Sequence, residues 1–227
     1  MIYRLNGYAL RVLKEYPDEY VSALESFGLV KGDLFTRHGV DYDDEFFEIM
    51  DDFILNNTNG LSKSEVYSIF GYTTNFFYQD LNYWLREGIN TSQTSGIKDL
   101  IDSGLAKLPS WNGQSQIYRG IKITGGDAQL QSILSNYQIN NPITELQFTS
   151  VSASSNTAFL NHANTKIKMT ITLKPDSRVR DISALSDGVF YRGFPPPELL
   201  FPSAISFHVD DIVESSNGVS TIFLTEL

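Results

Sequence analysis

The hydrophobic pattern of this chain changes its period partway along, and this change limits the folds that the chain can adopt. Within the segment Tyr72–Glu87, large apolar residues recur at positions i, i+4, i+7 and i+8: Phe77, Leu81, Trp84 and Leu85. That spacing gives a helix one apolar stripe. The segment Lys166–Leu173 instead alternates polar and apolar residues, as a strand does when one face of its sheet is buried. Helices followed by strands predict the α+β class and not a doubly wound parallel sheet.

Local signals divide these two regions into elements. Ser62 and Glu65 form a capping-box pattern at a helix start, and a further helix is predicted from about Ser95 to Leu105. Besides Lys166–Leu173, strands are predicted over residues 116–123, 145–152, 178–182, 204–209 and 219–225. Two short helices are predicted among these strands, over residues 126–134 and 154–162. We therefore expect an N-terminal helical extension over residues 1–60 and a core over residues 61–227, packed as one compact domain.

Composition excludes several kinds of chemistry. The chain has no cysteine, which removes disulfides, thiolate catalysis and cysteine-bound zinc. It has three histidines, His38, His162 and His208, none at a helical ligand spacing from another, so no metal is expected. The net charge of -10 excludes a uniformly basic surface for nucleic acid, although a local basic groove is compatible with it.

No membrane span and no export signal are found in the sequence. No stretch reaches about 18 apolar residues, and Arg4 and Arg11 interrupt the apolar start of the chain. We therefore expect no membrane partner and a cytoplasmic location, in the producing cell or in a target cell.

Three separate segments together offer a cation, hydroxyl groups and a carboxylate at strand ends. They are Gln116–Gly120, which contains Arg119; Phe148–Ser152, which contains Ser150; and Pro197–Pro202, which contains Glu198. A guanidinium suits a dinucleotide with two phosphates, and a carboxylate suits a ribose that becomes an oxocarbenium ion as it loses its base. The combination indicates chemistry on NAD. No Gly-x-Gly-x-x-Gly, P-loop or Gly-x-Ser-x-Gly motif is present, so NAD would bind without a Rossmann fingerprint.

In this order and with these gaps, the segments resemble those of the mono-ADP-ribosyltransferases of the arginine-serine-glutamate type. That superfamily includes many bacterial toxins and phage enzymes that modify host proteins. The resemblance covers roughly residues 66–210, and it includes Gly71–Thr73 and Asn82–Arg86, which look like the helix before the catalytic core. It implies a core of two packed β-sheets, NAD as the substrate, and no metal or other cofactor.

The resemblance also implies a role for each site residue. Arg119 would bind the phosphates and ribose of NAD, and the backbone of Gly120 would meet the nicotinamide amide. Ser150 would orient Glu198 by a hydrogen bond, with Ser152 in support. Glu198 would hold the ribose 2'-hydroxyl and stabilise the cation that forms as nicotinamide leaves. Phe159 lies where members of the family often carry an aromatic ring that packs on the nicotinamide, although its spacing also fits a helix core.

One position departs from the family pattern. Many members carry Glu or Gln two residues before the catalytic glutamate, where it contacts an arginine or asparagine acceptor, and this chain has Pro196 there. Proline has no side-chain donor or acceptor, which argues against the usual arginine-modifying assignment. Tyr191, Arg192 and Phe194 would then contact the acceptor.

Several functions stay open at this point. The acceptor could be a protein side chain, such as a serine or threonine hydroxyl, or a base or ribose hydroxyl of a nucleic acid. Water could be the acceptor, in which case the enzyme is mainly an NAD glycohydrolase. A non-catalytic binding module on a degenerate transferase fold is the third alternative. The setting expected from the resemblance is a phage enzyme, a toxin or an effector, for which an inhibitor or antitoxin is a further possible partner.

Overall fold

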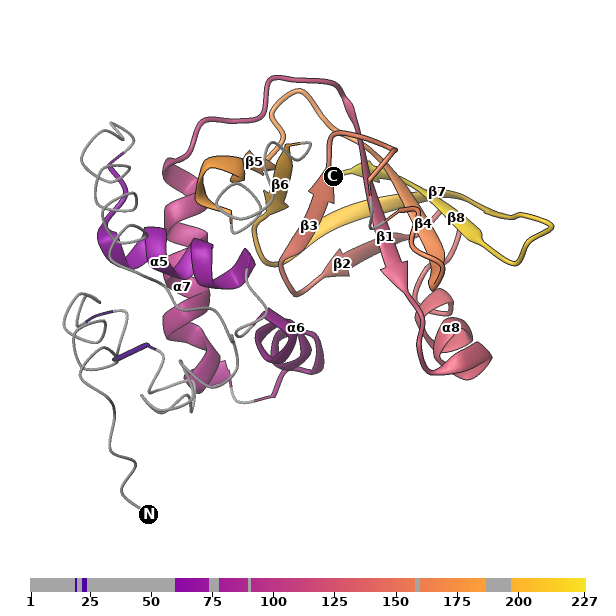
Figure 1. Cartoon of the computed structure of the whole chain (residues 1–227), viewed down its shortest axis with the longest axis horizontal. Helices are drawn as coiled ribbons and strands as arrows, with labels where there is room; N and C mark the ends of the chain where they lie inside the picture. Colours follow the sequence, from indigo (N-terminus) through magenta and orange to yellow (C-terminus); the bar gives the residue numbers. More distant parts are fainter. Residues whose placement is uncertain are drawn as a thin grey trace, which may run out of the picture. The chain divides into compact units, whose positions relative to one another are not determined.

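The computed structural model describes residues 60–73, 78–89, 91–157, 160–186 and 197–227, together with Glu19, Ser22 and Ala23. The chain divides into two compact units. A helical unit comprises residues 1–109 and 185–191, and a sheet unit comprises residues 110–184 and 192–227 (Figure 1). No helix in the described part of the chain has the length and apolar character needed to cross a bilayer.

The helical unit contains helices α5 (Lys63–Thr73), α6 (Tyr78–Glu87) and α7 (Thr91–Lys107). The predicted helix start at Tyr72 is wrong, because α5 continues through Gly71 and ends at Thr73. Tyr72 is 4% exposed, and its hydroxyl accepts a hydrogen bond of 2.9 Å from Asn82 Nδ2 in α6. Gly71 is buried inside α5, so it does not break the helix as its residue type suggested.

The predicted capping box is confirmed at the start of α5. The Ser62 amide donates to Glu65 Oε2 over 2.7 Å, and the Glu65 amide donates to Ser62 Oγ over 3.2 Å. Glu65 is also bound by α7, because its carboxylate accepts from Ser103 Oγ at 2.6 Å and from Lys107 Nζ at 2.7 Å. The carboxylate that caps α5 therefore also joins α5 to α7.

These two helices approach each other closely at Gly104. A Cβ atom placed there would lie 2.9 Å from Ile69 Cδ1 and 3.2 Å from Glu65 Cβ. Both distances are too short for ordinary packing, so the absence of a side chain at Gly104 permits this approach.

In its described residues the sheet unit contains eight strands and helix α8 (Gly126–Leu134). A short 3₁₀ helix, η1 (Ser183–Leu185), begins in this unit and ends at Leu185, the first residue of the second segment of the helical unit. In chain order the strands are β1 (Gln116–Lys122), β2 (Pro142–Glu145), β3 (Thr149–Ser152), β4 (Thr165–Thr172), β5 (Arg180–Asp181), β6 (Glu198–Phe201), β7 (Ile205–Glu214) and β8 (Ser220–Glu226). The predicted helix over residues 154–162 is not found in its described residues, 154–157 and 160–162, which form turns and bends. There the Ser154 hydroxyl accepts a hydrogen bond of 3.1 Å from the Asn156 amide, which closes a turn and caps no helix.

All eight strands belong to one sheet, in the order β2-β7-β8-β4-β1-β3-β6-β5. Among the strands of the described residues, β4 and β8 pair in parallel and the other pairs are antiparallel. Strands β1 and β3 are joined at one registered pair, Tyr118 with Ser152, whereas β1 and β4 are paired along the whole of β1. The sheet therefore consists of a five-stranded part, from β2 to β1, and a three-stranded part, from β3 to β5, with a narrow junction between them.

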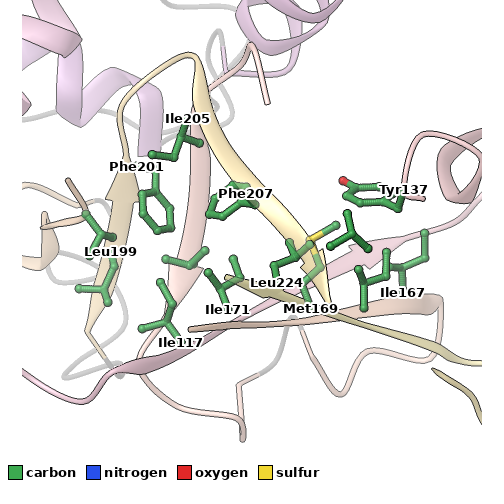
Figure 2. Close-up of a cluster of buried hydrophobic side chains, with 14 of the residues drawn as sticks. Ile117, Tyr137, Ile167, Met169, Ile171, Leu199, Phe201, Ile205, Phe207 and Leu224 are labelled. Carbon is green, nitrogen blue, oxygen red and sulfur yellow. The ribbon is translucent and has the colours of Figure 1, made fainter. Parts of the chain in front are cut away.

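The two parts of the sheet pack on each other through their apolar faces. Phe201 of β6 and Phe207 of β7 lie in different parts of the sheet, yet their ring centroids are 5.3 Å apart in an edge-to-face contact. Figure 2 shows these rings in one cluster with Ile117, Ile171 and Leu224. The α+β class is confirmed, and the two expected sheets are two parts of one sheet that folds over its own core.

The network around Glu65 predicts a pH-dependent stability. Burial raises the pKa of Glu65, but hydrogen bonds from Lys107, Ser103 and the Ser62 amide outweigh burial, so the pKa lies below its ordinary value. The ionised carboxylate therefore stabilises the folded state above the pKa of the unfolded chain, and this contribution is lost as the pH falls through the lower folded pKa. Glu65→Gln should lower the free energy of unfolding by about 1–3 kcal/mol at pH 7.

Urea unfolding, followed by circular dichroism from pH 7 to pH 3, measures this effect. The difference between wild type and Glu65→Gln should shrink as the pH falls below the ordinary pKa of a glutamate and through the lower pKa of folded Glu65, because the carboxylate of the wild type then becomes protonated. Glu87→Gln is the matched control, because the side chain of Glu87 is 49% exposed and pairs at 3.9 Å with the similarly exposed Arg86. Equal effects of the two substitutions would contradict the role of Glu65.

Candidate active site

The three segments predicted to carry the chemistry lie on neighbouring strands. Arg119 is on β1, Ser150 and Ser152 are on β3, and Glu198 is the first residue of β6. In the sheet order β3 lies between β1 and β6. Ser152 is registered with Tyr118 on one side and with Glu198 on the other. The narrow junction between the two parts of the sheet therefore coincides with the predicted site.

The pairing also decides which side chains share a face of the sheet. Directly opposed residues in an antiparallel pair project to the same face, and successive residues alternate. One face therefore carries five of the residues in question: Tyr118, Gly120, Ser150, Ser152 and Glu198. Four of these five were predicted site residues. Tyr118 was not assigned a role, although alternation around Arg119 could have indicated that it would share a face with the other residues.

Arg119 lies on the other face of β1. It falls between Ile117 and Ile121 in the alternation and is registered with Met169, which is 3% exposed in the core. The strand geometry thus brings Gly120, and not Arg119, onto the face of Glu198. Since β1 and β3 share no registered pair beyond Tyr118 and Ser152, Arg119 follows directly after the point where the two strands part.

The guanidinium of Arg119 has an unsatisfied donor. Among the described residues, its Nη1 atom is buried and has no hydrogen-bond partner. The hydroxyl of Thr149, which lies on the same side of the neighbouring strand β3, is also buried without a hydrogen-bond partner. An unpaired buried polar group costs free energy, and more so when it is charged. Both groups are donors, so an anionic or strongly polar ligand would satisfy them.

A second arginine near the site is already engaged. Arg180 on β5 is registered with Leu200, and its Nη1 atom donates to the carbonyl oxygens of Ser177 and Val179, each over 3.0 Å. Burial lowers the pKa of Arg180, while the charge of Glu226 raises it and the charge of Arg178 lowers it, and the net shift is downward. Arg180 therefore binds main-chain carbonyl groups at the edge of the sheet, and Arg119 is the better candidate for a ligand contact.

The register distinguishes the two serines of β3. Ser152 lies directly opposite Glu198, whereas Ser150 lies opposite Leu200. The sequence-based role of Ser150 as the residue that orients Glu198 stays a prediction, and the pairing favours Ser152 for a direct contact. The hydroxyl of Ser152 also accepts a hydrogen bond of 3.1 Å from the Ser154 amide, which holds its oxygen in place.

Two residues that hold Glu198 were missed by sequence reasoning. The Glu198 amide donates to Ser183 Oγ over 2.9 Å, and the Ser183 hydroxyl donates to Asp181 Oδ1 over 2.6 Å. Asp-x-Ser is a common local hydrogen-bonding pattern, so the sequence could have indicated the turn but not its contact with Glu198.

Other predicted residues cannot be placed. Phe159, Tyr191, Arg192, Phe194 and Pro196 lie outside the described residues. Within the described ranges, no group of three or more His, Cys, Asp or Glu side chains gathers in a way that could hold a metal ion.

Known proteins resemble this chain in both sequence and fold. No family model matches it. A curated relative, the NAD(+)--protein-arginine ADP-ribosyltransferase Tre1 of Pseudomonas putida (strain GB-1), is 32% identical over 165 residues. These residues make up 72% of this chain but 29% of the relative, so the chain spans less than a third of that protein's length.

Solved structures show the same fold. The ADP-ribosyltransferase HopU1 of Pseudomonas syringae pv. Tomato DC3000 has a TM-score of 0.61 and 17% identity, covering 100% of this chain and 99% of its own. Exoenzyme S of Pseudomonas aeruginosa, in a complex with human 14-3-3 protein beta and carba-NAD, has a TM-score of 0.59 and 18% identity. The match covers 90% of this chain and 88% of exoenzyme S. At these identities the structures establish the fold alone. The chain is thus similar in sequence to an ADP-ribosyltransferase over these 165 residues, and it has the fold of solved ADP-ribosyltransferases.

Proposed function

We propose that this protein is an NAD-dependent mono-ADP-ribosyltransferase of the arginine-serine-glutamate type. The observation that carries the proposal is the arrangement at the junction of the sheet. Ser152 and Glu198 are registered opposite each other there, and Arg119, one residue past the junction on β1, has a buried Nη1 atom without a partner among the residues that the structure describes. The carboxylate of Glu198 suits a substrate with a cationic transition state, and the unpaired guanidinium donor of Arg119 suits the anionic phosphates of the same substrate.

The reaction would break the bond between the ribose C1 atom and the nicotinamide nitrogen. The bonding electrons leave with nicotinamide, and the ribose becomes an oxocarbenium ion. Glu198 stabilises this cation and holds the ribose 2'-hydroxyl, while Ser150 and Ser152 restrain the carboxylate. An acceptor nucleophile then attacks the ribose carbon and loses its proton. The negative charge of Glu198 favours the transition state more than the uncharged ground-state ribose, as catalysis requires.

Arg119 would bind the phosphates, with Thr149 as a second donor on the same side of the sheet. Alternation places these groups on the face opposite Glu198, so a ligand that contacts both faces has to pass where β1 and β3 part. A dinucleotide suits this arrangement, because its phosphates and its reacting ribose lie in different parts of one extended molecule. On the Glu198 face, Gly120 lets a ligand approach the backbone closely, since it has no side chain.

We propose a protein side chain as the acceptor. The relative Tre1 is named for its action on protein arginine, and arginine is therefore the first acceptor to test. Pro196 argues for a different side chain, such as serine or threonine, because it provides no group to bind a guanidinium. Labelled NAD added to a cell lysate, followed by separate protease and nuclease digestion, would show whether the label resides on protein or on nucleic acid. Agmatine, a small guanidine, would test arginine directly, and label found only in free ADP-ribose would favour the glycohydrolase alternative.

Glu198→Gln should abolish most of the nicotinamide release. The substitution keeps the size of the side chain but removes the charge that stabilises the cation, and a loss of about 100-fold or more in kcat is expected. Chromatographic measurement of nicotinamide tests this, with thermal unfolding as the control for folding. Wild-type turnover by Glu198→Gln would show that Glu198 is not the catalytic carboxylate, whereas no nicotinamide release from the wild type would favour the non-catalytic alternative.

Arg119→Ala should weaken NAD binding. The loss of a charge-assisted hydrogen bond of about 1.5–3 kcal/mol corresponds to a rise of roughly 10- to 100-fold in KM for NAD. Arg119→Lys, which keeps the charge without the planar fork, should recover only part of the affinity. An unchanged KM in the alanine variant, at an unchanged melting temperature, would show that Arg119 does not bind the substrate.

The register predicts different effects for the two serines of β3. Ser152→Ala removes the hydroxyl directly opposite Glu198 and should lower kcat about tenfold, which corresponds to one hydrogen bond of about 1.4 kcal/mol. Ser150→Ala should have a smaller effect, since Ser150 lies opposite Leu200. A larger loss in Ser150→Ala would support the role that the sequence resemblance implies for Ser150.

A further inference from the structure

The segment that follows β5 binds both the carbonyl and the amide group of Glu198. Its carbonyl oxygen accepts a hydrogen bond of 2.9 Å from the Ile182 amide. Its amide donates over 2.9 Å to Ser183 Oγ. The registered pairing of β5 with β6 ends at Asp181 and Leu199, so at the Glu198 amide a side-chain hydroxyl replaces a main-chain partner.

Asp181 fixes the direction of this hydroxyl. Asp181 Oδ1 accepts a hydrogen bond of 2.6 Å from Ser183 Oγ and another of 2.9 Å from the Ser183 amide. Because the hydroxyl hydrogen is used toward the carboxylate, the lone pairs of the oxygen remain for the Glu198 amide. The bond to the carboxylate is charge-assisted, and such bonds are shorter and stronger than those between neutral groups. The chain of contacts thus runs from the Asp181 carboxylate through the Ser183 hydroxyl to the Glu198 main chain.

The sequence before Glu198 makes this contact important. Residues 195–197 are three successive prolines, and none of them has an amide hydrogen to donate. The Glu198 amide is therefore the first N–H group after this run through which the sheet can hold the start of β6. Without Ser183, the strand would be anchored by an amide only from Leu199 onward, one residue beyond the carboxylate that has to be positioned.

We propose that Ser183, oriented by Asp181, is a positioning residue that holds the main chain of Glu198 in its catalytic place. The inference rests on the proposed function, since it assigns a task to residues that support the same glutamate. Neither residue contacts the reacting atoms in this assignment. Their effect is to restrict the position of the Glu198 Cα atom, and a shift of about 1 Å at a reacting group can cost about 100-fold in rate.

Ser183→Ala, Ser183→Thr and Asp181→Asn test the proposal. Ser183→Ala should lower kcat for nicotinamide release about tenfold, with KM for NAD changed less than about twofold, because substrate binding is retained while the carboxylate is misplaced. Ser183→Thr keeps a hydroxyl and should restore most of the rate. Asp181→Asn should have an intermediate effect, because the amide oxygen still accepts but carries no charge.

Ser177→Ala is the matched control. Its hydroxyl accepts a hydrogen bond of 3.2 Å from the Val179 amide, just before β5, and so makes the same kind of bond without contacting Glu198. It should leave kcat within about twofold of the wild type. Equal losses of kcat in Ser183→Ala and Ser177→Ala, in step with their melting temperatures, would overturn the proposal in favour of general destabilisation. Wild-type kcat in Ser183→Ala would also overturn it.

Hydrogen exchange of the Glu198 amide separates this inference from the proposed function. The amide should be protected in the wild type and should exchange at least about tenfold faster in Ser183→Ala. Rapid exchange in the wild type would overturn the anchor itself. A wild-type protein that protects this amide but releases no nicotinamide would refute the proposed function, and with it the catalytic purpose of the anchor, while the hydrogen bond would stand.

Discussion

The packing of β6 against β7 is the interaction on which the rest of the sheet unit depends. Phe201 and Phe207 bury their rings against each other although their strands lie far apart in the sheet order. Burial of apolar area is the main force that can fold a hydrogen-bonded sheet over itself. The sheet then needs a place where it can bend, and the single registered pair between β1 and β3 provides it.

The bend also places polar residues where regular pairing ends. Ser152 belongs to the last pair that joins the two parts of the sheet, and Glu198 lies beside it on β6. Arg119 follows at the first position where β1 is free of β3, and its buried Nη1 atom lacks a partner among the described residues. The predicted site residues of three strands therefore lie where the registered pairing of β1 with β3 ends.

Glu65 in the helical unit and Glu198 in the sheet unit are held in different ways, because one serves stability and the other the proposed function. Glu65 is buried in a closed set of hydrogen bonds to Ser62, Ser103 and Lys107, so its carboxylate stabilises the helical unit. The main chain of Glu198 is held by hydrogen bonds with the Ile182 amide and the Ser183 hydroxyl. Restraint of the main chain fixes the position of the Glu198 Cα atom, as the proposed mechanism requires.

Sequence by itself determined the elements that depend on near neighbours. The alternation of β4, the capping box of Ser62 and Glu65, and the residue types of Arg119, Ser150 and Glu198 were all readable, because each depends on a short stretch of chain or on the chemistry of one side chain. Tertiary structure alone decided that α5 continues through Gly71 and that Ser183 binds the Glu198 amide. It also decided that Ser152 and not Ser150 lies opposite Glu198, and that Arg119 lies on the other face of the sheet. These outcomes depend on strand register and on contacts between distant segments, where a shift of one residue exchanges the two faces of a strand and no local pattern records which register packs best.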